Sequence, residues 1–185
     1  MNFENLKETT VNSKELFRGV VANLFIDEVE LPDGSHSTRE YLKHNGAVAV
    51  IPVDDDGNVY LVNQYRYPFS RVMTEIPAGK LDTPDEDPFE AAKRELREET
   101  GFTSKKITFL GEFIGSAAII GETIYVYLAQ DLVAGKQDLD RDEFLNVIKM
   151  PLDKLVKKIM DGEIADGKTL YAALKVDKMF NEKQI

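Results

Sequence analysis

Three glutamates lie close together in a predicted helix, at spacings that place their carboxylates on one face. Glu95, Glu98 and Glu99 are separated by three and four positions, and residues at these separations are neighbours on a helix surface. Like charges there repel one another unless a cation lies among them. Carboxylate oxygens without Cys or His favour Mg2+ or Mn2+ over zinc, and these ions commonly act on substrate phosphates. The spacing therefore predicts a Mg2+ or Mn2+ site, with a solvated, salt-bridged helix face as the alternative.

The helix that carries these glutamates has sequence signals at both ends. Asp87 suits the N-cap, Pro88 suits the first helical position, and Glu90 would complete a capping box. Gly101 is expected to end the helix. The apolar residues at helical spacing, which would face the core, are Phe89, Ala92 and Leu96.

The composition of the whole chain excludes several classes of protein. A net charge of −10 over 185 residues argues against a nucleic-acid-binding surface. The chain has no Cys, which rules out disulfides and thiol chemistry and is compatible with a reducing interior. No stretch resembles a signal peptide or a membrane span. We therefore expect a cytoplasmic protein that has no nucleic-acid or membrane partner.

The N-terminal part predicts a small antiparallel sheet. After a polar opening segment, residues 17–31 have the apolar pattern of a strand, and residues 37–44 return after a turn at Pro32 to Gly34. A sheet of two or three strands is poorly stable alone. We therefore expect residues 1–45 to pack on the main domain, residues 46–185, or on a second subunit in a homodimer.

The main domain reads as alternating strands and helices around the glutamate-bearing helix. The expected strands span residues 47–53, 59–66, 106–113, 122–128 and a segment through 144–148, and the expected helices span 152–160 and 169–180. The turn at 54–58 is expected to join the first two strands as a hairpin. Arg66 lies between Tyr65 and Tyr67, where it could bind a phosphate or remain a surface charge. This pattern predicts an α+β or an α/β class.

The stretch from Gly79 to Phe102 resembles the Nudix box. The matching residues are Gly79, Glu86, Arg94, Glu95, Leu96, Glu98, Glu99, Gly101 and Phe102. One departure is visible, because six residues separate Gly79 from Glu86 where the family pattern has five. The resemblance implies an α/β/α sandwich around a mixed sheet, joined here to the small N-terminal antiparallel sheet.

Motifs outside the box resemble the ADP-ribose pyrophosphatase branch of this family. They are Arg39-Glu40, the segment 64–68, the segment 75–81 and the segment 142–144. In that branch the N-terminal sheet is exchanged or packed between two subunits, and residues from both subunits form the nucleotide pocket. The resemblance therefore implies a homodimer.

The resemblance also implies roles for individual residues. The implied metal ligands are Glu95, Glu98, Glu99 and the carbonyl of Ala78. The implied substrate-binding residues are Arg39, Glu40, Arg66, Glu75, Ser116 and Glu122. The implied catalytic residues are Glu143 as general base, Glu98, and Arg94, which we expect to orient the glutamates rather than perform chemistry.

The implied reaction is Mg2+-dependent hydrolysis of a nucleoside diphosphate linked to another group, with ADP-ribose giving AMP and ribose 5-phosphate. The branch usually carries Ser-Pro-Gly and then an acidic residue beyond the box, whereas this chain has Ala117 and Ala118 between Ser116 and Glu122. Another nucleotide sugar or an oxidised nucleoside triphosphate therefore stays open as the substrate. A non-catalytic nucleotide sensor on the same fold is the alternative from another class.

Overall fold

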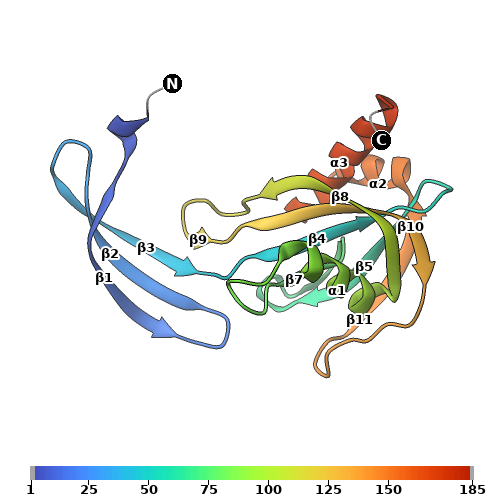
Figure 1. The fold of residues 1–185 in the computed structure, drawn as a ribbon, viewed down its shortest axis with the longest axis horizontal. Coiled ribbons are helices and arrows are strands. Elements are labelled where there is room, and N and C mark those ends of the chain that lie inside the picture. The colour runs from blue at the N-terminus through green and yellow to red at the C-terminus, as the bar shows by residue number, and fades with distance from the viewer. Residues whose placement is uncertain (1–2, 184–185) are drawn as a thin grey trace. The chain divides into compact units, whose positions relative to one another are not determined.

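The computed structural model describes residues 3–183 and divides into two compact units. The smaller unit contains the residues up to Asn45 together with Ser116–Glu122, and the larger unit contains Gly46–Gly115 and Thr123–Ile185. Figure 1 shows the strands and helices of each unit.

The smaller unit is a four-stranded sheet in the order β1-β2-β3-β9. Its elements are η1 (Glu4–Leu6), β1 (Thr9–Arg18), β2 (Asn23–Glu30), β3 (His36–Lys43) and β9 (Ile120–Gly121). The first three strands pair antiparallel, and β9 pairs parallel with β3. The turn between β2 and β3 is confirmed, with Gly34 at a φ of 82°.

The predicted single strand over residues 17–31 is wrong. The polar opening segment forms β1, the chain turns after Arg18, and β2 begins at Asn23. Every residue of β1 is exposed, so this strand lacks the apolar alternation that marks a half-buried strand in a sequence. It is held by backbone pairing with β2, which a sequence pattern does not reveal.

The larger unit contains two sheets and three helices. One sheet has the order β7-β4-β10-β8 and consists of β4 (Ala47–Pro52), β7 (Ala78–Lys80), β8 (Phe102–Phe113) and β10 (Ile124–Ala134). The other has the order β11-β5-β6 and consists of β5 (Asn58–Arg66), β6 (Arg71–Glu75) and β11 (Leu145–Pro151), with η2 (Tyr67–Phe69) between β5 and β6. The helices are α1 (Pro88–Thr100), α2 (Leu152–Met160) and α3 (Gly167–Asn181).

The four-stranded sheet is mixed and is covered by helices on both faces. β4 runs parallel to β10, whereas the other pairs are antiparallel. Ala49 and Ile51 pack with side chains of α2 and α3. Val48 and Val50, which point to the other face, pack with Leu96 of α1. Figure 1 shows α2 and α3 side by side and α1 apart from them across the strands. The expected α/β/α arrangement around a mixed sheet is confirmed.

The predicted hairpin turn between the first two strands of this unit is present, but the two strands do not continue as a pair beyond it. β4 and β5 share only an isolated bridge between Val53 and Val59, and they belong to different sheets. The acidic turn itself is present, and the Asp54 carboxylate accepts hydrogen bonds from the backbone of Asp56 and Asn58. Each strand takes its neighbours from distant parts of the chain, so the local turn does not determine the pairing.

The boundaries predicted for α1 are confirmed. The carboxylate of Asp87 accepts a hydrogen bond of 2.9 Å from the backbone N–H of Phe89, and Gly101 ends the helix at a φ of 76°, a left-handed conformation that suits glycine. Glu90, expected to reach back to the N-cap, lies 2.8 Å from Lys93 Nζ. Across residues 3–183, no helix is long and apolar enough to cross a membrane.

Candidate active site

The acidic face of α1 is buried against β7. Glu95 and Glu99 are 9% and 2% exposed, and one carboxylate oxygen of Glu99 accepts a 3.1 Å hydrogen bond from the backbone N–H of Ala78. A Cβ atom at Gly79 would lie 2.0 Å from a carboxylate oxygen of Glu95. The backbone of β7 therefore approaches both carboxylates closely, and only glycine leaves room for the side chain of Glu95.

Burial and mutual repulsion raise the pKa values of these two glutamates. The pKa of Glu95 rises to about 7, first through burial and then through the charges of Glu98 and Glu143, although Arg94 partly offsets the rise. The pKa of Glu99 rises to about 8, first through burial and then through the charges of Glu143 and Glu95. A bound cation would relieve this repulsion and stabilise both carboxylates in their charged form.

Arg94 links the glutamates of the box, as the sequence predicted for an orienting residue. Its Nη1 atom lies 2.7 Å from Glu95 and 3.2 Å from Glu98. Its Nη2 atom lies 3.2 Å from Glu86 and 3.3 Å from the carbonyl of Lys80. Glu86 also accepts a 2.6 Å hydrogen bond from the backbone N–H of Asp82, so the extra residue in the turn still leaves Glu86 beside α1.

The donor set of this site fits a hard divalent cation. Glu95, Glu98 and Glu99 supply carboxylate oxygens, the ligands that Mg2+ and Mn2+ prefer. No three acidic or histidine side chains in residues 3–183 converge as a ready cation site, and Glu98 lies 3.2 Å from Arg94 and 3.1 Å from Arg97. Cation binding would therefore require rotation of these side chains, and Glu95 would have to share its carboxylate between the cation and Arg94.

Arg66 and Glu75 form a second part of the site, on β5 and β6. The Nε and Nη2 atoms of Arg66 each lie 2.7 Å from a carboxylate oxygen of Glu75, a side chain that is 2% exposed. Burial raises the pKa of Glu75, but the hydrogen bonds from Arg66 and the charge of Lys168 outweigh it and hold the pKa below its usual value. Glu75 therefore orients Arg66, and its predicted contact with substrate stays a prediction.

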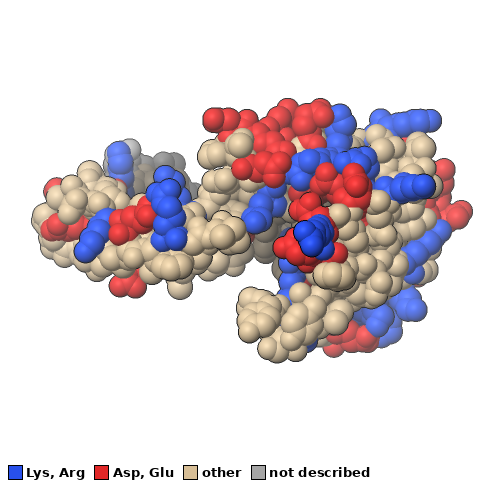
Figure 2. Space-filling model, turned by 90° about the horizontal axis from the view of Figure 1, so that it is seen from below, with Lys and Arg blue, Asp and Glu red and all other residues tan. Residues whose placement is uncertain are grey.

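Arg66 also lies within electrostatic reach of the acidic side chains. Its charge lowers the pKa of Glu99 and of Glu143, so it contributes positive charge to the same region. Figure 2 shows Lys and Arg side chains interspersed among Asp and Glu on the face of the larger unit seen there. A mixed surface of this kind suits an anionic ligand that is bound partly by cations.

Glu143 lies on the loop between β10 and β11. Its carboxylate accepts a 3.4 Å hydrogen bond from Gln64 Nε2. Burial raises its pKa first, and the charge of Asp140 adds to the rise. Its charge also contributes to the raised pKa values of Glu95 and Glu99. The predicted general base is therefore close enough to interact with the predicted metal ligands.

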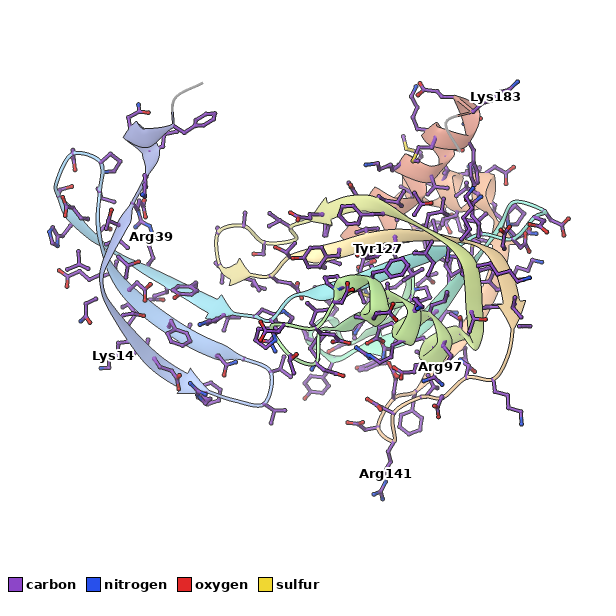
Figure 3. The ribbon with its side chains drawn as sticks, viewed as in Figure 1. Lys14, Arg39, Arg97, Tyr127, Arg141 and Lys183 are labelled. Carbon is purple, nitrogen blue, oxygen red and sulfur yellow. The ribbon has the colours of Figure 1, made fainter. Side chains whose placement is uncertain are left out.

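The same loop is tied to the C-terminal end of α1. Gln137 Nε2 donates a 2.5 Å hydrogen bond to the carbonyl of Glu99, and the backbone N–H of Asp138 donates one of 3.0 Å to the carbonyl of Glu98. Arg97 also forms an ion pair of 3.0 Å with Asp138. Figure 3 shows Arg97 at this end of α1 and Arg141 at the tip of the loop, pointing away from the strands. The sequence pattern does not predict Gln137, because its partner is a backbone carbonyl 38 residues away.

A cavity of about 340 Å³ lies beside the loop. Its lining includes Glu143, the exposed aromatic rings of Tyr65 and Phe144, and two amide side chains, Asn63 and Asn146. The volume falls at the lower end of the range of small-molecule sites, roughly 300 to 1,000 Å³. Aromatic and amide groups of this kind can bind a ring that carries hydrogen-bonding edges.

The other predicted substrate residues lie in the smaller unit. Arg39 pairs with Glu8, with Nη2 and Oε1 2.5 Å apart, and Glu40 is exposed on β3. The carbonyl of Ser116 accepts two backbone hydrogen bonds in a turn. Glu122 lies 3.3 Å from His44. Their roles in substrate binding stay predictions.

Comparisons with known proteins agree with this geometry. Residues 43–172 match the family model described as the NUDIX domain. The chain is 43% identical over 171 residues to the ADP-ribose pyrophosphatase of Bacillus subtilis, covering 91% of this chain and 92% of that protein. It is 40% identical over 168 residues to the methanol dehydrogenase activator of Bacillus methanolicus, covering 90% of each chain.

A solved structure of an ADP compounds hydrolase has the same fold. The two structures superpose with a TM-score of 0.82, covering 97% of each chain at 23% sequence identity. This similarity supports the fold alone.

Proposed function

The chain belongs to the Nudix family, and from this premise we propose that it hydrolyses the diphosphate bond of ADP-ribose with Mg2+ as cofactor, giving AMP and ribose 5-phosphate. The observation that carries the proposal is the buried pair of carboxylates, Glu95 and Glu99, which repel each other under the backbone of β7. Burying two carboxylates side by side destabilises a folded protein. Such pairs are therefore found mainly at functional sites. Binding a divalent cation is the function that fits the chemistry of this pair.

The glutamates of α1 and the backbone of β7 hold the cation. Glu95 and Glu99 supply buried carboxylates, Glu98 supplies a more exposed one, and Ala78 supplies a carbonyl. Arg94 holds Glu95 and Glu98 at defined positions through charge-assisted hydrogen bonds. When bound, Mg2+ neutralises charge on the diphosphate and makes water a better nucleophile.

Arg66 and Glu143 act on the substrate and on water. Arg66 has five N–H donors, of which Glu75 uses two, so the remaining donors can bind diphosphate oxygens. Glu143 accepts the proton of the attacking water, because its raised pKa makes it a stronger base than an ordinary glutamate. Gln64 holds the carboxylate of Glu143 by a 3.4 Å hydrogen bond. The hydrogen bonds and the ion pair between this loop and the end of α1 keep Glu143 near the glutamates.

ADP-ribose is the favoured substrate because of the similarity to the Bacillus subtilis enzyme over nearly the whole of both chains. A second candidate is another nucleotide-linked sugar diphosphate. It is favoured by Ala117 and Ala118, which replace the Pro and Gly of the ADP-ribose branch in a segment that forms a turn in the smaller unit.

A substrate panel tests this proposal. The wild-type protein would be given ADP-ribose, other nucleoside diphosphate sugars, dinucleotides and nucleoside triphosphates with Mg2+, and products would be measured by phosphate release after phosphatase treatment. We expect the highest kcat/KM for ADP-ribose and no turnover with a chelator. A preference for another sugar diphosphate would support the second candidate, and a preference for triphosphates would contradict both.

We also propose that the chain forms a homodimer through residues 1–45, while residues 46–185 form the catalytic domain. Exposed apolar side chains in the N-terminal segment support this assignment; they are Val11, Phe17, Val20 and Val21. Phe17, Val20 and Val21 lie at or beside the turn that follows β1, and contiguous exposed apolar surface commonly marks a contact with another chain.

A further inference from the structure

Lys168 is a buried lysine in the first turn of α3, and it contacts two carboxylates. It is 8% exposed. Its Nζ atom lies 2.5 Å from Glu75 Oε2 and 3.0 Å from Asp166 Oδ1. Because Glu75 also binds Arg66, four charged side chains from β5, β6 and α3 form one connected cluster. Nothing in the sequence pattern predicts this cluster, since Lys168 and Glu75 are 93 residues apart.

A lysine at the position of Lys168 does not stabilise α3. The N-terminal end of a helix has a partial positive charge, which disfavours a cation there. Asp166 already caps α3, because its carboxylate accepts hydrogen bonds from both the backbone N–H and the hydroxyl of Thr169. Burial of an ammonium group is costly unless it is paired. The contact that explains Lys168 is therefore the one with Glu75.

We propose that Lys168 is a positioning residue for Arg66 and acts through Glu75. Glu75 Oε2 accepts from Lys168 Nζ and from Arg66 Nη2, and Oε1 accepts from Arg66 Nε. With Lys168 in place, the carboxylate has one orientation in which all three donors are satisfied. The guanidinium of Arg66 is thereby fixed, with the N–H groups that Glu75 does not use left for the diphosphate. This inference rests on the proposed function only in that Arg66 binds the diphosphate.

The surrounding backbone makes this cluster a rigid support. The hydroxyl of Thr169, which is fully buried, accepts a 2.8 Å hydrogen bond from the backbone N–H of Ile76. Ile76 directly follows Glu75 at the end of β6. The first turn of α3 therefore holds both the side chain of Glu75 and the backbone beside it. A binding group supported in this way keeps its orientation before the ligand arrives.

The test compares Lys168→Met with a matched control on the same helix, Lys175→Met. Lys175 is exposed, and its Nζ atom bonds to the carbonyl of Leu110, so the control removes a bonded lysine from α3 without touching Glu75. We expect Lys168→Met to raise KM for ADP-ribose about tenfold with a smaller change in kcat, and to weaken ADP binding by a similar factor in calorimetry. Lys175→Met should leave both values near wild type.

A double-variant cycle separates positioning from a purely structural role. If Lys168 acts through Arg66, then Lys168→Met combined with Arg66→Ala should bind ADP no more weakly than Arg66→Ala alone. Additive losses would overturn the inference, as would normal ADP binding by Lys168→Met. Should Lys168→Met fail to fold, judged by circular dichroism, Lys168→Gln takes its place. Its amide is uncharged and shorter than the lysine side chain, so it should also weaken ADP binding, and normal ADP binding by a folded Lys168→Gln would overturn the inference.

The binding measurement keeps this inference apart from the proposed function. Wild-type protein that binds ADP but hydrolyses no diphosphate would contradict the proposed function, and the cycle on ADP binding would still decide the role of Lys168. Wild-type protein that binds no ADP with Mg2+ present would overturn both.

Discussion

The proposed chemistry of this protein depends on two carboxylates that the fold keeps out of water. Glu95 and Glu99 are buried on α1, and their raised pKa values show that the folded state opposes their ionisation in the absence of a cation. The spacing of these residues could be predicted from the sequence. Their burial could not, because it depends on the approach of β7, whose residues Ala78 and Gly79 lie well before α1 in the chain.

Glu95, with a pKa of about 7, and Glu99 should together make the stability of the metal-free protein depend on pH, and the larger shift is that of Glu99. Its pKa is about 8 in the folded protein against 4.5 for an ordinary glutamate. The folded state therefore binds this proton more tightly, and the free energy of unfolding without metal should fall as the pH rises from about 4.5 to about 8. Denaturant titration in the presence of a chelator, at several pH values in this window, measures the slope.

Glu99→Gln should remove much of this slope and should be more stable than wild type near the upper end of the window. Glu112→Gln, at an exposed position on β8, is the control and should keep the wild-type slope. An identical slope in Glu99→Gln and wild type would show that Glu99 ionises freely in the folded protein.

Gly79→Ala tests the close approach of β7 to Glu95. The new Cβ would lie 2.0 to 2.3 Å from the carboxylate atoms of Glu95, so that side chain must move. We expect at least a tenfold loss of Mn2+ affinity and a destabilisation of about 1 to 3 kcal/mol. Gly115→Ala is the control, because its Cβ would meet the ring of Phe113 at an ordinary 3.5 Å. Unchanged Mn2+ affinity in Gly79→Ala would place the cation away from Glu95.

At the scale of elements, local signals predicted helices better than strands. The ends of α1 follow from Asp87 and Gly101, which act through contacts within a few residues. β1 was missed because it is exposed along its whole length, and β4 and β5 were paired wrongly because their partners lie far away in the chain. The sequence predicts Arg66 as a candidate phosphate-binding residue. Its contacts with Glu75, and through Glu75 with Lys168, join β5, β6 and α3, and no local sequence pattern relates these elements.

The contact between α1 and the following loop should matter for turnover. Gln137→Ala removes the hydrogen bond to the carbonyl of Glu99 and loosens the loop that carries Glu143. We expect kcat to fall by about three- to tenfold, while Mn2+ affinity stays near wild type because the carboxylates are untouched. Lys136→Ala, at the exposed neighbouring position, should behave as wild type. Equal losses of kcat and Mn2+ affinity in Gln137→Ala would mean that the contact supports α1 rather than the loop.

At the scale of the whole molecule, the smaller unit has few buried side chains of its own. Within residues 5–45, Asp27 and Val29 are the buried residues, whereas large apolar side chains such as Phe17 and Val21 are exposed. Light scattering coupled to size-exclusion chromatography should show a dimer for the full chain. Phe17→Ser combined with Val21→Ser should shift it toward the monomer, and a monomeric wild type would contradict the proposed homodimer.

The measurement that tests the central claim most directly is the hydrolysis of ADP-ribose by the wild type and by Glu99→Gln, with AMP and ribose 5-phosphate resolved by chromatography. We predict both products from the wild type with Mg2+, none with a chelator, and a kcat at least about 100-fold lower in a folded Glu99→Gln. Wild-type turnover that persists in the chelator, or normal turnover by Glu99→Gln, would contradict the claim that the buried glutamates of α1 hold the catalytic cation.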